Sequence, residues 1–182
     1  ARENGRGALM ADFNLAIEAV IGFEVGYWDD PRGGPTKYGI TRPTLEEAKR
    51  RGLVSQDRQI RDLTPAEAKT IYRVLYWNEI RGDEIRNQVV AGELLDTAVN
   101  CGQGTAVKLA QRALNFLGEH LAEDGILGPR TLEALNKWGY KDGLALFKAM
   151  NGEQYIYYKG ITGITFPAGW MKRIQDYNPR RA

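Results

Sequence analysis

An almost continuously apolar segment of the chain reads Val89-Val-Ala-Gly-Glu-Leu-Leu-Asp-Thr-Ala-Val99. Apolar residues on every face of a helix indicate burial on most sides, so we expect this segment to form the central helix of the fold. Its polar exceptions, Glu93 and Asp96, and the following Asn100 then need internal partners. Asp96, Asn100 and Gln111 are interpreted as a buried polar network, and a set of side chains facing a ligand is the alternative.

Helical patterns continue on both sides of this segment. Phe13, Ile17 and Val20 recur at helical spacing and predict a helix that ends near Gly26. Apolar spacing also predicts helices over 106–117 and 144–158, with a tight turn at 124–131 and a short helix through Leu132 and Leu135 between them. The segment 27–41 is rich in Gly, Pro and Asp, which predicts a loop or a small irregular hairpin. The chain is therefore expected to be mainly α, a compact helical bundle with this irregular region after its first helix.

Two further helices are predicted from capping signals. Thr44 followed by Glu47 has the spacing of a capping box and predicts a helix that ends around Gly52. Thr64, Pro65 and Glu67 give the same signal, with proline at the first helical position, for a helix that continues toward residue 77.

Length and charge limit the classes of function. The chain has 182 residues and a net charge of +2, so it lacks the concentrated basic patches that a nucleic-acid-binding protein needs. Its longest apolar run, 15–23, is interrupted by Glu18 and is too short to span a membrane, so stable membrane insertion is not expected. We expect neither a nucleic-acid partner nor a cofactor, and a monomer is the simplest state.

Histidine and cysteine chemistry is also restricted. The single histidine, His120, and the single cysteine, Cys101, are too few for a zinc site built from histidine and cysteine ligands, so no metal site is expected. Cys101 with His120 as nucleophile and base is the alternative. Because Cys101 follows the most apolar segment, we interpret it as a structural residue.

The chain is expected to divide near 87–90 into a catalytic region, 10–88, and a helical region packed on it, 89–182. No Ser/Gly linker separates the two. Residues 1–9 are polar and precede Met10, so they are interpreted as an expression leader, and no signal peptide is recognised. The protein is therefore expected to be made in the cytoplasm.

Glu24 continues the apolar stripe of the first predicted helix. At roughly 100° per residue, Phe13, Ile17, Val20 and Glu24 fall within about 60° of one another. Apolar neighbours and the negative end of the helix dipole both raise the pKa of such a carboxyl group. A carboxylic acid that stays protonated near neutral pH can protonate a glycosidic oxygen. A solvated residue or a structural ion pair is the commoner alternative at a helix end.

The segment after Glu24 supplies groups suited to a sugar substrate. Tyr27, Trp28 and Tyr38 have aromatic faces that could stack on sugar rings or belong to the core. Thr36 and Thr41 could orient a water molecule, and a turn or cap position is the alternative.

This part of the sequence resembles the glycoside hydrolase family 108 N-acetylmuramidases of phage endolysins and bacterial secretion systems. The resemblance is carried by Phe23-Glu-Val-Gly-Tyr27, Asp30-Pro31, Gly33-Gly34, Thr36-Lys-Tyr-Gly-Ile-Thr41 and Tyr72-Arg-Val-Leu-Tyr-Trp77. The segments Asp96-Thr-Ala-Val-Asn-Cys-Gly102 and Asp124-Gly-Ile-Leu-Gly-Pro-Arg-Thr131 are similar to the predicted peptidoglycan-associated domain that usually follows. Val25 stands where that family has glycine, and the loop before Gly33 is shorter.

The resemblance implies a lysozyme-like fold and hydrolysis of the β-1,4 bond between N-acetylmuramic acid and N-acetylglucosamine in peptidoglycan. It implies Glu24 as the catalytic acid and Asp30 as the second carboxylate, with Asp29 as the alternative. Thr36 is the third candidate catalytic residue, through the water molecule that it could orient. Tyr27, Asp29, Tyr38 and Thr41 are the expected substrate-binding residues. The 124–131 segment is either turn chemistry or a wall contact.

Two other functions compete with hydrolysis. A lytic transglycosylase also works with one glutamic acid, and a wall-binding module would need no catalysis. The setting implied by the resemblance is an endolysin that lyses a phage host, acting on the wall after a holin has opened the membrane.

Overall fold

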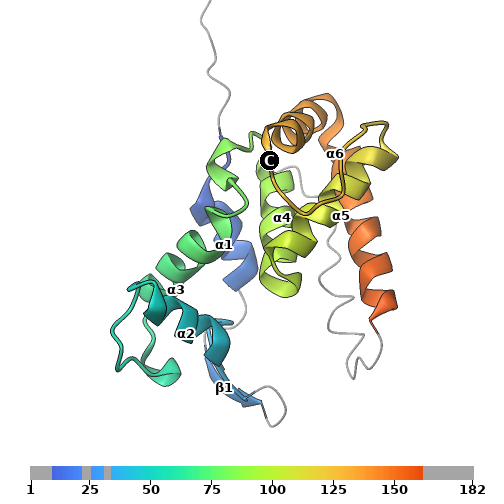
Figure 1. Ribbon diagram of the computed structural model, residues 1–182. Coiled ribbons are helices and arrows are strands. Elements are labelled where there is room, and N and C mark those ends of the chain that lie inside the picture. The colour runs from blue at the N-terminus through green and yellow to red at the C-terminus, as the bar shows by residue number, and fades with distance from the viewer. Residues whose placement is uncertain (1–9, 22–25, 31–33, 162–182) are drawn as a thin grey trace, which may run out of the picture.

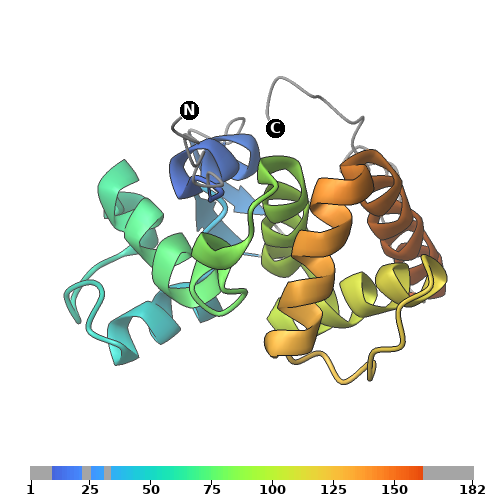
Figure 2. The same cartoon turned by 90° about the horizontal axis from the view of Figure 1, so that it is seen from above.

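The central helix expected from the sequence is α4, Gln88–Cys101. In the computed structural model, which describes residues 10–21, 26–30 and 34–161, α4 contacts α1 (Phe13–Ile21), α5 (Gln103–Phe116) and α6 (Pro129–Gly160). Figures 1 and 2 show α4 between the helices of the N-terminal half and those of the C-terminal half. Leu94 and Leu95 are fully buried, which confirms the expected burial on several faces.

The N-terminal half combines short helices with one small sheet. Strands β1 (Tyr27–Asp30) and β2 (Gly34–Lys37) form the antiparallel hairpin predicted for 27–41. The remaining elements are α2 (Arg42–Arg50), the 3-10 turns η1 (Ile60–Asp62) and η3 (Gly82–Glu84), α3 (Pro65–Tyr72) and the π-helical turn η2 (Arg73–Trp77). The mainly α fold is thereby confirmed.

The C-terminal half consists of α5 and α6 packed on each other and on α4. Within α6 the backbone leaves helical geometry at Asp142, with φ −158° and ψ 79°. The Asp142 carboxylate accepts a hydrogen bond from the Ala145 amide at 2.9 Å, so it caps the second part of the helix. The prediction of two helical segments after residue 129 is confirmed.

The two capping predictions have different outcomes. Thr64 and Glu67 form the complete capping box at the start of α3. The predicted start at Thr44 is wrong: α2 begins at Arg42, with Thr41 in the cap position and Pro43 in the first turn. Proline fixes a helical φ in the first turn, so the helix can begin before Thr44.

A π-helical turn follows α3 and buries Trp77, which is fully shielded from solvent. A Cβ atom on Gly82 would lie 2.3 Å from the Trp77 ring, so the ring packs directly on the glycine backbone. The Trp77 indole donates to Asp83 at 2.8 Å, and Asp83 also pairs with Arg73 at 2.6 Å. Phe13 of α1 meets the Trp77 ring edge-on at 5.6 Å, so this cluster fixes the start of α1.

Candidate functional site: the hairpin after the first helix

The expected catalytic acid, Glu24, lies outside the described residues. Helix α1 is described to Ile21, and the chain is described again from Gly26. Phe13, Ala16 and Ile17 of α1 are buried, as the apolar stripe predicts. The role of Glu24 therefore stays a prediction, and the described geometry of the site is that of the hairpin that follows.

Both strands of the hairpin belong to the segment that was predicted to contact the substrate. Trp28 lies opposite Thr36, and residue 30 pairs with Gly34. Because residues alternate between the two faces of a strand, positions 28, 30, 34 and 36 share one face, and position 29 belongs to the other. The side chain of Asp30 lies outside the described part of the structure. The register thus groups the position of Asp30 with Thr36 and separates it from Asp29.

Strand β1 exposes its aromatic side chains. Tyr27 is 44% exposed and Trp28 is 67% exposed, and Asp29 is also exposed. The exposed ring of Trp28 offers a large apolar face, which is suited to stacking on a ligand. Thr36 is half-buried across from it.

The base of the hairpin is fixed to the helical part of the N-terminal half. Tyr38 has φ +53°, a left-handed backbone conformation, and its carbonyl accepts a hydrogen bond from the Tyr72 hydroxyl at 2.9 Å. The Lys37 ammonium donates to the Arg61 carbonyl at 2.7 Å, and Ile40 is fully buried. Tyr38 is itself half-buried, so part of its ring belongs to the core.

Thr41 is the cap residue of α2, and its hydroxyl lies 3.1 Å from the Thr44 hydroxyl. Thr41 thus occupies the cap position, although its side chain makes no capping hydrogen bond to the helix backbone, and a role toward substrate stays a prediction.

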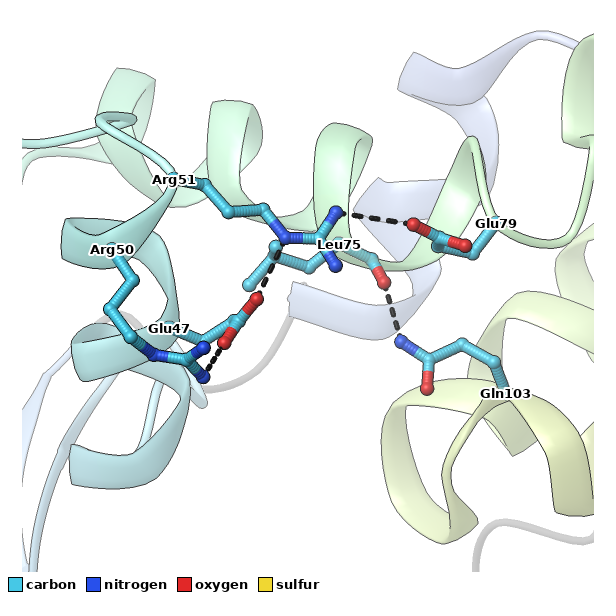
Figure 3. A network of polar contacts seen from close by, with 6 residues as sticks. All are labelled: Glu47, Arg50, Arg51, Leu75, Glu79 and Gln103. Carbon is cyan, nitrogen blue, oxygen red and sulfur yellow. Dashed lines mark hydrogen bonds and ion pairs between the residues drawn. The ribbon is translucent and has the colours of Figure 1, made fainter.

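Polar contacts connect α2, the π-helical turn and α5 (Figure 3). Arg51 pairs with Glu47 at 2.7 Å and with Glu79 at 3.1 Å, and Glu47 also pairs with Arg50. The Gln103 amide donates to the Leu75 carbonyl in the π-helical turn at 2.5 Å. The segment that follows α3 is thus held by α2 on one side and by α5 on the other. Tyr72, which bonds to the base of the hairpin, directly precedes this segment.

A second polar cluster is buried between α4 and α6. Glu93 is only 2% exposed, and Thr97 donates to its carboxyl group at 3.5 Å while receiving a hydrogen bond from Gln154 at 3.1 Å. Burial, together with the like charge of Asp96, raises the pKa of Glu93 to about 8. Burial of Glu93 therefore favours its protonated form at neutral pH.

The members of the predicted polar network have separate described contacts. The Asn100 amide donates to the Asp96 carbonyl at 2.7 Å, close to Glu93. Gln111 instead serves the 124–131 turn, where its amide donates to Asp124 at 2.8 Å and its carbonyl accepts from the Gly125 amide at 2.9 Å. The turn reading of 124–131 is thus supported by its contacts.

Cysteine chemistry, metal binding and a membrane span were also considered from the sequence. Cys101 is half-buried, and its sulfur lies 3.9 Å from the Tyr158 hydroxyl. Among residues 10–21, 26–30 and 34–161, no group of three or more acidic, His or Cys side chains could hold a metal ion. Within the same ranges, no helix has the length and hydropathy needed to cross a membrane.

Comparison with known proteins gives two matching family models. The Glycosyl hydrolase 108 model matches residues 17–102, and the Predicted Peptidoglycan domain model matches residues 105–175. A solved structure of SagA from Brucella abortus is similar over 89% of this chain and 88% of that chain, with 31% sequence identity and a TM-score of 0.74. No curated protein matches the chain significantly.

Proposed function

Since the chain belongs to the glycosyl hydrolase 108 family and degrades peptidoglycan as a glycoside hydrolase, we propose that it is an N-acetylmuramidase with Glu24 as its acid. The bond cleaved would be the β-1,4 linkage between N-acetylmuramic acid and N-acetylglucosamine. The observation that carries this proposal is the hairpin directly after α1, which combines an exposed Trp28 with Thr36 across the ladder.

Glu24 would protonate the glycosidic oxygen as the bond breaks. The cation that develops on the muramic acid ring then needs a carboxylate or an activated water molecule on its other side. Asp30 is the preferred second carboxylate, because its position shares a hairpin face with Trp28 and Thr36. Thr36 would hold the attacking water or the substrate hydroxyl in place, and Tyr27 and Tyr38 would line the sugar subsite.

The hairpin is suited to this task because its base does not depend on substrate for its position. The bonds Tyr72 to Tyr38 and Lys37 to Arg61 hold it against α3 and η1. Groups held before substrate binds lose little entropy in the reaction, so a fixed hairpin favours catalysis.

The decisive experiment is Glu24→Gln, assayed by clearing of purified cell walls. Removing a general acid costs about 10²-fold to 10⁴-fold in rate. Glu18→Gln is the matched control, because Glu18 is exposed on α1 and should retain full activity. Clearing by Glu24→Gln at the rate of the control would remove Glu24 from the mechanism.

Product analysis separates the competing functions. A muramidase releases fragments with a reducing muramic acid, whereas a transglycosylase releases anhydro ends that are lighter by one water. A wall-binding module would sediment with walls and release nothing. Comparing Asp30→Asn with Asp29→Asn in the same assay identifies the second carboxylate, and we expect the larger loss for Asp30→Asn.

A further inference from the structure

A pocket lies at the seam between the two regions matched by the family models. It is an open depression of about 310 Å³, lined by Arg86, Glu133, Asn136, Lys137 and Tyr140. Arg86 lies in the region 17–102, and the other four residues lie in 105–175. Ligand pockets commonly have volumes from about 300 Å³ upward and favour such interfaces.

The floor of this pocket is rigid. The Asn136 amide of α6 accepts from the Arg86 backbone amide at 2.8 Å and donates to the Glu84 carbonyl at 2.9 Å. One residue further, the Asn87 side chain donates to the Gly139 carbonyl at 3.0 Å. A Cβ atom on Gly139 would lie 3.0 Å from Asn87, so glycine permits this close approach. The linker before α4 is therefore clamped onto α6.

The side chains that line the pocket carry opposite charges, and two of these charges form no ion pair within the described residues. Among the described residues, neither the Arg86 guanidinium nor the Glu133 carboxylate makes an ion pair, and both residues are exposed. Lys137 pairs with Glu119 at 2.7 Å but remains 58% exposed. Tyr140 is 93% exposed. Residues with two cations, one anion and an aromatic ring thus line a single small volume.

This arrangement is complementary to a small zwitterion. Arginine binds carboxylates through two parallel hydrogen bonds, and Glu133 beside the Tyr140 ring suits an ammonium group. The glycan strands of peptidoglycan are close to neutral, whereas their peptide stems carry carboxylates and the ammonium of a diamino acid. We propose that this pocket binds the peptide stem of peptidoglycan, with its carboxylates on Arg86 and Lys137 and its ammonium on Glu133.

The inference rests on peptidoglycan being the substrate, but it is tested without any glycosidic bond. The probe is the tripeptide N-acetyl-L-Ala-γ-D-Glu-meso-diaminopimelate, whose N-terminus is acylated as it is in the wall, titrated into the full chain and followed by amide chemical shifts and calorimetry. We expect shifts centred on Arg86, Asn136 and Tyr140. Arg86→Gln should weaken binding at least tenfold, and Lys148→Gln, an exposed cation on α6 outside the pocket, should leave it unchanged.

The charge of Glu133 provides a second, more specific test. Glu133→Gln should weaken binding of the tripeptide severalfold but leave unchanged the binding of the same peptide with its diaminopimelate amine acetylated. Glu153→Gln is the matched control on the same helix. Glycerol 3-phosphate tests the rival ligand, an anionic wall polymer, which would bind more tightly in Glu133→Gln.

Two results would overturn the stem-peptide site: no saturable tripeptide binding, or equal affinity in Arg86→Gln and wild type. Tighter binding of glycerol phosphate than of tripeptide would also overturn it. If the protein clears walls but does not bind the stem peptide, only the stem-peptide site is refuted. Stem binding by a chain that never cuts walls instead defeats the proposed hydrolase activity.

Discussion

Replacing Glu93 by glutamine should change how the stability of the protein depends on pH. In the folded state the pKa of Glu93 is raised to about 8 by burial and by the neighbouring Asp96, whereas its ordinary value is 4.5. The folded chain therefore holds a proton that the unfolded chain releases between these two values. Stability contributed by this group is fully present below pH 4.5 and is lost as the pH rises toward 8.

The magnitude follows from the difference between the two pKa values. One bound proton changes the free energy of unfolding by about 1.4 kcal/mol per pH unit, and the whole difference corresponds to about 5 kcal/mol. That is comparable with the total stability of a small protein, about 5 to 15 kcal/mol. From pH 5 to pH 8 the wild-type free energy of unfolding should fall by about 4 kcal/mol.

The assay is urea unfolding, followed by far-ultraviolet circular dichroism between pH 5 and pH 8.5. Glu93→Gln keeps the shape of the neutral acid, so it should match the wild type within about 1 kcal/mol at pH 5. It should be more stable by several kcal/mol at pH 8. The window starts at pH 5 because Asp124, whose pKa is lowered by the Gln111 hydrogen bond, titrates below it.

Glu153→Gln is the control, since this half-buried residue has no described ion pair and should keep the wild-type slope. If the Glu93→Gln and wild-type curves run parallel from pH 5 to pH 8.5, Glu93 is ionised in the folded protein and the reasoning from its burial is refuted.

Three other substitutions test the packing and the hairpin. Gly82→Ala should destabilise the protein by about 3 kcal/mol, because the new methyl group would overlap the buried Trp77 ring, and an unchanged unfolding midpoint would contradict that packing. Thr64→Ala should cost about 1 kcal/mol through loss of its capping box, whereas Thr44→Ala, which caps no helix, should cost clearly less in the same melt. Trp28→Ala should slow wall clearing about tenfold, worth about 1.4 kcal/mol of binding, without lowering the melting temperature, since the ring is 67% exposed; full activity would remove it from the sugar subsite.

Local patterns in the sequence were sufficient where short-range forces decide the structure. The apolar segment 89–99 is buried in α4, and the Thr64 capping box involves residues only three apart. The same capping rule failed at Thr44, because Pro43 starts the helix earlier and Glu47 pairs with Arg50 and Arg51 instead of returning to the cap.

Long-range contacts explain what the sequence could not predict. Glu93 was expected to need a partner, but Gln154, which completes its cluster through Thr97, lies on α6, far along the chain. Arg86 carried no signal at all, because its clamp on Asn136 joins positions 50 residues apart. The π-helical turn at 73–77 likewise has no periodicity that distinguishes it from an ordinary helix.

The same long-range contacts bear on how a strand of peptidoglycan would be held. Arg81, in a left-handed conformation, donates to the Leu127 carbonyl at 3.3 Å, and Asn136 clamps the linker before α4. On the other side, the Trp77 cluster connects the same segment to α1, from which the hairpin follows. A stem peptide bound at Arg86 would therefore be linked to the base of the hairpin through packed elements of the described residues. Binding energy gained at the stem could then help to orient the glycan at the hairpin, which raises the rate only while the clamp stays intact.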